Sequence, residues 1–196
     1  MKKIVSIIFI TLLIFNTDLF AEDNQSIKRI FEGKESAKIT IIAYESLTCG
    51  HCADFHKNVY PELKKDFVDK GLVKIEFRHF PLDIAAFNAS KIGQCNNDGS
   101  SDILNILFLG QKKWVKGKTP EEATSYLRKF LKDEGVNVNF EKCLSNKNIE
   151  DYILNDRIEG VKKFKVNATP TIIINDKKFD KTLNYKNLKK YLEKLI

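Results

Sequence analysis

The spacing of apolar residues predicts a strand, a helix and a second strand near the start of the chain. Residues 37–46 (AKITIIAYES) are apolar, rich in β-branched side chains and bounded by charge, as in a buried strand. Residues 51–71 repeat apolar positions at helical spacing, with Pro61 expected to kink or break the helix and Gly71 to end it. Residues 72–80 (LVKIEFRHF) alternate as a strand does. This order predicts a right-handed parallel unit.

The middle of the chain, from residue 83 to about 160, has helical periodicity. Thr119 is the expected N-cap of one helix, and Pro120 its first position. Glu122 is the expected capping-box partner, and Gly135 the stop. The predicted helices of this region cover residues 87–95, 100–114, 119–135, 139–146 and 148–164.

Strand signals return only near the C-terminus. Residues 169–175 (TPTIIIN) are apolar and β-branched, and Asn175-Asp176 suits a tight turn into residues 177–180. Residues 184–196 have the pattern of an amphipathic helix. Its apolar stripe is formed by Leu188, Leu192 and Leu195.

These signals predict one α/β domain interrupted by a helical insertion, without internal repeats or low-complexity linkers. The first part of the domain is expected at residues 22–83, the insertion at 84–160 and the second part at 161–196. A domain of this size can bury a sizeable core.

The first 21 residues have the layout of a secretory signal peptide. Lys2 and Lys3 form a positive start, residues 4–15 are an apolar run, and cleavage is expected after Ala21. The alternative is a retained membrane anchor, but the run is short for a span of about 20 residues. We therefore expect a mature protein in the periplasm, where disulfides persist.

The charge pattern argues against a nucleic-acid partner. The chain has 33 Lys and Arg against 26 Asp and Glu, a net charge of +7. Its lysines are scattered among acids, as in RKFLKDEG and KKYLEKLI, without an Arg-rich run or aromatic-basic interleaving. This composition predicts a solvated, lysine-rich surface.

Cys49 and Cys52 are separated by two residues, directly after the first predicted strand. Such a pair can bind a metal, form a structural bridge or exchange electrons with other proteins. If Cys49 is the N-cap of the next helix, free N–H groups and the helix dipole stabilise its thiolate and lower its pKa. His51 can add a positive charge or a hydrogen bond. This placement favours a redox centre, Cys49-Gly50-His51-Cys52.

A zinc site is an alternative for this pair, with Cys49, Cys52 and His56 as three ligands. The sequence offers no fourth ligand nearby, so we expect no metal, and no cofactor is expected. His56 is expected to be a surface residue of the helix. His79 is expected to be structural.

Cys95 and Cys143 both fall in the predicted insertion. In an oxidising compartment, two cysteines left over after one redox pair are expected to form a structural disulfide with each other. A resolving or second catalytic role is one alternative, and a pair of free buried thiols is another.

Three stretches resemble the DsbA family of exported thiol–disulfide oxidoreductases: residues 44–52 (YESLTCGHC), 77–83 (FRHFPLD) and 166–175 (VNATPTIIIN). The resemblance covers nearly all of the chain after the predicted signal peptide. It implies an α/β, thioredoxin-like fold with an inserted helical subdomain.

The resemblance also implies roles for individual residues and partners. Cys49 is expected to be the attacking cysteine and Cys52 the resolving one. Thr169-Pro170 is expected to be a cis peptide that faces their disulfide. The expected partners are exported client proteins with free cysteines and a membrane-embedded protein that reoxidises the enzyme.

Two positions depart from the family pattern. Gly50 stands where many members have proline, so the Gly-His dipeptide looks more like that of protein disulfide isomerase. Ala43 stands where members often carry a buried acid. Glu45 lies two residues further on the same face of an extended strand, which makes it a candidate proton acceptor for Cys52. The alternative is a solvated glutamate at a strand end.

Three functions follow as hypotheses. The first is an oxidase that introduces disulfide bonds into exported proteins. The second is a disulfide isomerase or reductase on the same fold, suggested by Gly50-His51 and Thr169-Pro170. The third is a non-enzymatic, chaperone-like binding module, which the intact cysteine pair disfavours.

Overall fold

The computed structural model describes residues 26–196, so the predicted signal peptide lies outside the described residues. A five-stranded sheet with the order β1-β3-β2-β4-β5 forms the centre of the fold. β2 and β3 are parallel, and the other neighbours are antiparallel. The strands are β1 (Phe31–Glu32), β2 (Ile39–Glu45), β3 (Val73–His79), β4 (Thr171–Ile174) and β5 (Lys177–Lys178).

Burial explains the two kinds of strand pattern. β2 lies between β3 and β4 and is buried on both faces, which is why its sequence is an almost continuous apolar run. β3 alternates buried and half-buried positions, with Val73, Ile75 and Phe77 facing the core. The short strand β1, which pairs with β3, was not predicted from the sequence.

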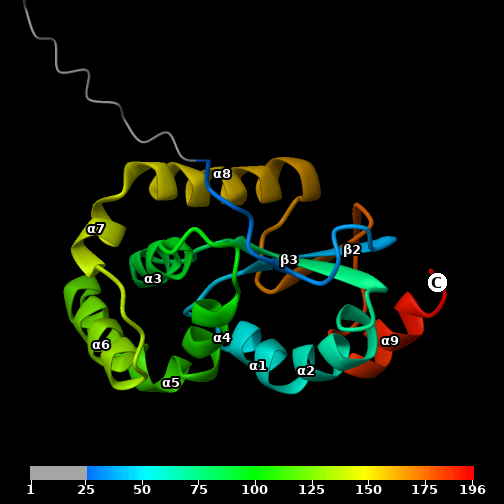
Figure 1. The fold of residues 1–196 in the computed structure, drawn as a ribbon, viewed down its shortest axis with the longest axis horizontal. Coiled ribbons are helices and arrows are strands. Elements are labelled where there is room, and N and C mark those ends of the chain that lie inside the picture. Colours follow the sequence, from blue (N-terminus) through cyan, green and yellow to red (C-terminus); the bar gives the residue numbers. More distant parts are fainter. Residues whose placement is uncertain (1–25) are drawn as a thin grey trace, which may run out of the picture.

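Helices cover both faces of the sheet (Figure 1). α8 runs along one face, and α1, α2 and α9 lie on the other. The helices of the first part are α1 (Gly50–Asn58), α2 (Tyr60–Leu63) and a π-helical turn, η1 (Lys64–Val68). The later helices are α3 (Ile84–Gln94), α4 (Asp102–Leu109), α5 (Gln111–Trp114), α6 (Pro120–Asp133), α7 (Phe140–Ser145), α8 (Lys147–Phe164) and α9 (Tyr185–Leu192).

The chain leaves the sheet after β3 and returns to it at β4, and the helices α3 to α8 lie between these strands in the sequence. The predicted fold class, a thioredoxin-like fold with an inserted helical subdomain, is confirmed. Thr119 caps α6 by accepting a hydrogen bond from the backbone of Glu122. The Glu122 carboxylate accepts the backbone N–H of Lys118, one residue before the expected capping-box donor.

Two predicted helices have different bounds in the structure. The helix predicted over residues 100–114 is divided at Gly110, where a Cβ atom would lie 2.0 Å from the ring of Phe130. The C-terminal helix ends at Leu192, so Leu195 is not on its buried stripe and is 42% exposed. The break predicted at Pro61 is present, because α1 ends at Asn58 and a separate short helix follows.

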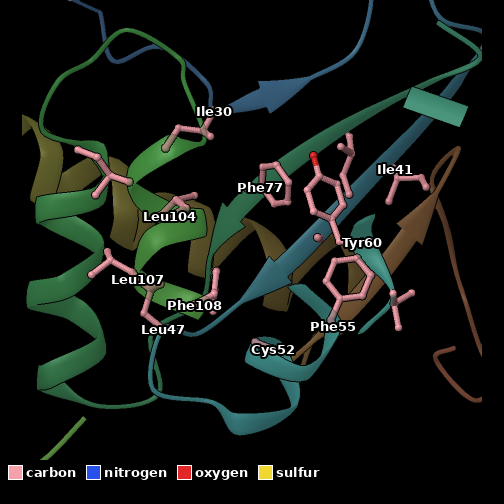
Figure 2. Close-up of a cluster of buried hydrophobic side chains, with 14 of the residues drawn as sticks. Ile30, Ile41, Leu47, Cys52, Phe55, Tyr60, Phe77, Leu104, Leu107 and Phe108 are labelled. Carbon is pink, nitrogen blue, oxygen red and sulfur yellow. The ribbon is translucent and has the colours of Figure 1, made fainter. Parts of the chain in front are cut away.

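One large apolar cluster joins the sheet to the insertion. Figure 2 shows Cys52, at the start of α1, among Leu47, Phe55 and Phe108, the last of these from α4. Cys52, the second cysteine of the predicted redox motif, is therefore part of the core. No helix within residues 26–196 is long and apolar enough to cross a bilayer.

Candidate active site

Cys49 lies at the junction between the loop after β2 and the helix α1. It is the N-cap of α1, with an extended backbone (φ −77°, ψ 119°), and its own side chain makes no capping hydrogen bond. Cys49 is half-buried, and the backbone N–H groups of His51 and Cys52 donate hydrogen bonds to its side chain. A charge at this position is stabilised by the unpaired N–H groups and the helix dipole.

These surroundings lower the pKa of Cys49 from its ordinary value of about 8.5 to about 5. The hydrogen bond from the Cys52 thiol contributes most to this shift, and partial burial of Cys49 opposes it. The Thr169 side chain and the backbone N–H groups of Cys52 and His51 also lower the pKa. Cys49 is therefore a thiolate at neutral pH.

Cys52 has the opposite environment. It is fully buried, and burial raises the pKa of its thiol far above the ordinary range. The hydrogen bond to Cys49 and the negative charge of Glu45 raise the pKa further. One sulfur is thus accessible and ionised and the other is buried and protonated, which is the asymmetry that an attacking and a resolving cysteine require.

The peptide bond between Thr169 and Pro170 is cis, and it lies opposite Cys49. In the thiol form, the Cys49 Sγ–H donates a hydrogen bond of 3.2 Å to the Thr169 carbonyl. The structure thus brings the loop before β4 to the cysteine pair, 120 residues away in the sequence. The sequence-predicted residues Cys49, Cys52, Thr169 and Pro170 come together in one site.

A family model described as thioredoxin matches residues 25–194. The chain belongs to this family, in its DsbA branch. It superposes on the crystal structure of alpha-DsbA1 from Wolbachia pipientis with a TM-score of 0.75 and 28% identity, covering 85% of this chain and 90% of that one.

Two curated relatives have names that describe disulfide chemistry. Disulfide bond formation protein D of Bacillus subtilis is 29% identical over 173 residues, 83% of this chain and 74% of that protein. A putative protein-disulfide oxidoreductase of Rickettsia bellii is 28% identical over 150 residues, which are 73% of this chain. The chain spans about half the length of that relative, 55%.

Side chains from α5 and from the turn between β3 and α3 hold the loop that carries Cys49. The Gln111 side chain, from α5, donates hydrogen bonds of 2.9 Å to the carbonyls of Leu47 and Cys49. From the β3–α3 turn, Asp83 accepts a 2.7 Å hydrogen bond from the Thr48 hydroxyl. Gln111 was not predicted from the sequence, since a lone glutamine carries no pattern that links it to a loop 62 residues away.

His56 is not the surface residue that the sequence analysis expected. It is 3% exposed, and its ring stacks on Phe108 with the centroids 4.1 Å apart. Its Nε2 lies 3.0 Å from Glu45 Oε2, and its Nδ1 lies 3.1 Å from Asn105 Oδ1. Both ring nitrogens therefore face Glu45 and Asn105. The prediction was wrong because α4 of the insertion covers this face of α1.

Glu45 is 4% exposed at the end of β2, so it is not a solvated glutamate. Its Oε2 faces His56, and its Oε1 has no hydrogen-bond partner among residues 26–196. Its charge acts on Cys52, whose pKa it raises. A buried carboxylate with one oxygen unpaired among residues 26–196 therefore lies within electrostatic reach of Cys52.

A chain of hydrogen bonds continues from His56 into the insertion. Asn105 donates through Nδ2 to the Ser101 hydroxyl (3.1 Å), and Ser101 donates to the carboxylate of Glu32. The chain therefore has a carboxylate at each end, Glu32 and Glu45. His56 lies between them, and each of its ring nitrogens faces an oxygen atom, of Asn105 or of Glu45.

The two residues inside the motif are accessible. Gly50 is exposed, and a Cβ atom added there would have no atom within 4 Å. His51 is also exposed and lines a hollow of about 670 Å³ next to Thr169 and Pro170. Its backbone N–H helps to lower the pKa of Cys49.

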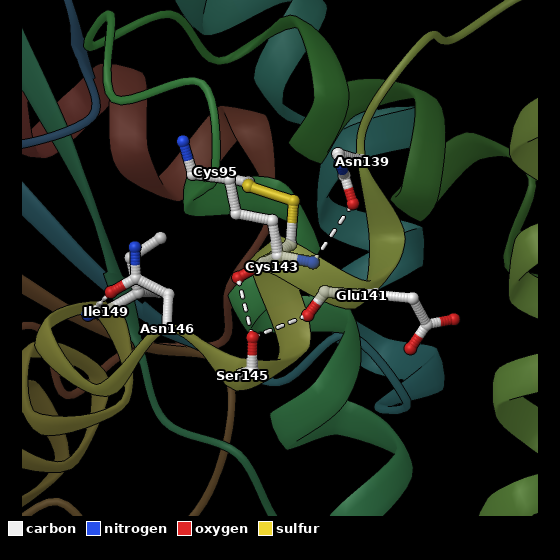
Figure 3. The surroundings of a disulfide bond; sticks show 8 residues. Cys95, Asn139, Glu141, Cys143, Ser145, Asn146 and Ile149 are labelled. Carbon is white, nitrogen blue, oxygen red and sulfur yellow. Dashed lines mark hydrogen bonds between the residues drawn. A yellow bond between two sulfur atoms is a disulfide. The ribbon is translucent and has the colours of Figure 1, made fainter.

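Cys95 and Cys143 form a disulfide in the insertion (Figure 3), joining the C-terminal end of α3 to α7 with their Cα atoms 5.4 Å apart. His79 is buried at the end of β3, with its Nε2 3.2 Å from Gln94 Oε1. Burial lowers the pKa of His79, which fits a neutral structural imidazole.

Proposed function

We propose that this protein is a thiol–disulfide oxidoreductase that introduces disulfide bonds into exported proteins. The observation that carries the proposal is the asymmetry between Cys49, with a pKa of about 5, and the buried, protonated Cys52. Stabilising the Cys49 thiolate stabilises the reduced form, so the disulfide form is a stronger oxidant. The names of the two relatives, a protein-disulfide oxidoreductase and a disulfide bond formation protein, support the same chemistry.

The oxidised form would carry a Cys49–Cys52 disulfide. A client thiolate attacks Cys49 Sγ, forming a mixed disulfide, and Cys52 leaves and takes up a proton. A second client thiolate then attacks the client sulfur of the mixed disulfide and releases Cys49 as a thiolate. Two client thiols thus become one disulfide, and the two electrons reduce the enzyme pair.

Reoxidation needs an external disulfide, for which we propose a membrane-embedded partner. Cys49 attacks that disulfide, and Cys52 then resolves the mixed disulfide after losing its proton. We propose that the unpaired oxygen of Glu45 accepts this proton, since the carboxylate is buried, acts electrostatically on Cys52 and is held by His56.

The proposed site of action is the periplasm, reached through a cleaved signal peptide. The support is the sequence of residues 1–21, with its positive start, apolar run and small residue at the expected cut. Oxidising chemistry on exported clients requires such a compartment.

A pair of assays tests the function. With a glutathione buffer, the protein should speed disulfide formation in reduced ribonuclease, and it should reduce insulin slowly. Fast insulin reduction, or rescue of scrambled ribonuclease without oxidation of the reduced form, would instead support the isomerase or reductase hypothesis. Inactivity in every assay would support the binding module.

Trapping of mixed disulfides tests which cysteine attacks the client and which one resolves the mixed disulfide. The Cys52→Ala variant should accumulate mixed disulfides with client proteins through Cys49, because no resolving thiol remains. The Cys49→Ala variant should trap few, since Cys52 is buried. Equal trapping by both variants contradicts the assignment.

A further inference from the structure

A hollow of about 550 Å³ opens beside the redox site on the side of the insertion. Thr48, the residue before the nucleophile, forms part of its lining. The other walls come from the start of α3 with Ile84, the loop after α5 with Val115, and the first turns of α6 with Ala123. The hollow thus joins the rim of the cysteine pair to the inserted helices.

Residues on both sides of Cys49 in the chain line a hollow, this one or the one against the cis peptide. Thr48 lines the first, while His51 and Thr169 line the second. The two hollows share no lining residue. A polypeptide whose cysteine reaches Cys49 can therefore extend into the insertion-side hollow with the residues on one side of that cysteine.

The insertion-side hollow presents apolar side chains that the fold leaves uncovered. Ile84 is 59% exposed and Val115 is 37% exposed. Both are aliphatic and line the hollow with Ala85, Pro120 and Ala123. Covering them with an apolar side chain of a bound segment removes this surface from water, which favours binding.

The charged side chains that line the hollow are two lysines and one aspartate. Lys116 and Lys118 line it and are exposed, and neither ammonium group has a carboxylate within 4.0 Å among residues 26–196. Asp83 also lines the hollow, and its carboxylate accepts hydrogen bonds from Thr48 and from the backbone of Ala86. These donors are neutral, so Asp83 keeps its negative charge, and the lining with its two lysines carries one positive charge in excess. This excess favours a bound group with negative charge.

We propose that this hollow binds the client segment that flanks the reacting cysteine, and that it favours segments with an apolar side chain and a carboxylate close to that cysteine. The inference rests on the proposed function, because it deepens the client preference of the same site. Apolar contact supplies part of the affinity, and Lys116 and Lys118 supply charge selection.

Reduced two-cysteine peptides test the proposal. The peptides share a leucine beside the first cysteine and differ in one nearby position, which is Glu, Gln or Lys. The second-order rate of their oxidation by the oxidised protein is measured at low ionic strength. We expect the Glu peptide to react about tenfold faster than the Lys peptide, with the difference shrinking as salt is added.

Variants separate the effect of the insertion-side hollow from the intrinsic reactivity of each peptide. The intrinsic reactivity is the same for every protein variant, so it cancels when the Glu-to-Lys rate ratio of one variant is compared with that of another. Lys116→Glu/Lys118→Glu should lower the Glu-to-Lys rate ratio to one or below. Lys112→Glu/Lys132→Glu is the matched control, because it changes the net charge equally at exposed lysines outside the hollow and breaks no ion pair among residues 26–196. It should keep the preference.

A separate variant tests the contribution of the apolar side chains that line the hollow. Val115→Thr keeps the side-chain shape and should slow oxidation of the leucine peptide about threefold while leaving a peptide with serine in that place unchanged. The proposal is overturned if the parent protein shows no Glu preference, or if Lys116→Glu/Lys118→Glu retains it. Failure of the proposed function is distinguishable, since then no peptide is oxidised whatever its flanks.

Discussion

Glu45 and His56 form a buried pair at the base of the redox site, with His56 Nε2 3.0 Å from Glu45 Oε2. Glu45 comes from the end of β2 and His56 from α1, and both are less than 5% exposed. The family's usual position for a buried acid holds Ala43 in this chain. The carboxylate near Cys52 is therefore supplied from a position two residues further along the strand.

Replacing this carboxylate separates two effects that have opposite signs. If Glu45 accepts the Cys52 proton, Glu45→Gln should slow resolution of a preformed mixed disulfide about 100-fold. If its charge only raises the pKa of Cys52, the same change should speed resolution. Rapid-quench kinetics across pH measure this step, with titration of the Cys49 thiolate as control, which should change little.

Removing the imidazole tests the pair through stability. His56→Leu leaves Glu45 buried without its partner, so the free energy of unfolding should fall by about 3–5 kcal/mol. Glu45→Gln/His56→Leu should recover part of this loss, because the unpaired charge is gone. Urea unfolding of both variants provides the double-mutant comparison. A double variant as unstable as the sum of the single ones would argue against a coupled pair.

The pair also shows what the sequence could and could not predict. The apolar run of β2, the alternation in β3 and the cap at Thr119 are local signals, and the structure follows them. The burial of His56 depends on α4, which begins 46 residues later and packs over α1. Helical spacing along α1 shows which residues share a face, but not that a second helix covers the face with His56.

The contacts of Gln111 with the active-site loop also depend on distant parts of the chain and could not be predicted from local sequence. The cysteine motif and Thr169-Pro170 can be recognised from the residues next to them in the sequence. The contacts of Gln111 with the carbonyls of Leu47 and Cys49 arise only when the insertion folds against the sheet.

The disulfide of the insertion should act on stability more than on turnover. Cys95 and Cys143 are 48 residues apart, and the loop-closure model assigns about 4 kcal/mol to a bridge of that size. Cys95→Ala/Cys143→Ala should lower the unfolding free energy by this order while leaving most of the ribonuclease oxidation rate. Denaturant unfolding and the oxidation assay check both parts. A variant of unchanged stability and lost activity would reverse the assignment.

The pKa of Cys49 predicts how pH acts on the reduced protein. The folded pKa of about 5 lies below the unfolded value of about 8.5. The unfolded state therefore binds more protons between these values, and the stability of the reduced form should rise with pH across this window. The gain is complete above about pH 8.5 and is lost as pH falls through about 5.

Cys52 contributes with the opposite sign, since its folded pKa is raised. Its contribution is present below about pH 8.5 and declines above it, outside the window in which Cys49 acts. Urea unfolding of the reduced and oxidised forms from pH 4 to 8 isolates the Cys49 effect, because the oxidised form has neither thiol. A reduced-minus-oxidised stability that stays constant with pH would contradict the low pKa.

Gly50 sets how firmly the first turn of α1 holds the thiolate. It is the first residue of the helix, where proline is pre-organised with φ near −65°. Nothing lies within 4 Å of an added Cβ atom, so there is space at Gly50 for the first carbon of a side chain. A stiffer turn should hold the N–H groups that face Cys49 more firmly and lower its pKa below about 5.

A lower Cys49 pKa stabilises the reduced form, so Gly50→Pro should make the couple more oxidising. One pKa unit corresponds to about 1.4 kcal/mol, or about 30 mV for this two-electron couple. Titration of the ultraviolet absorbance of the thiolate measures the pKa, and equilibration with glutathione measures the potential. Gly50→Ala is the control, because it adds a side chain without fixing φ, and it should shift both quantities less. If Gly50→Pro changes neither quantity, or moves the protein toward reductase behaviour, the flexibility of this turn does not set the potential.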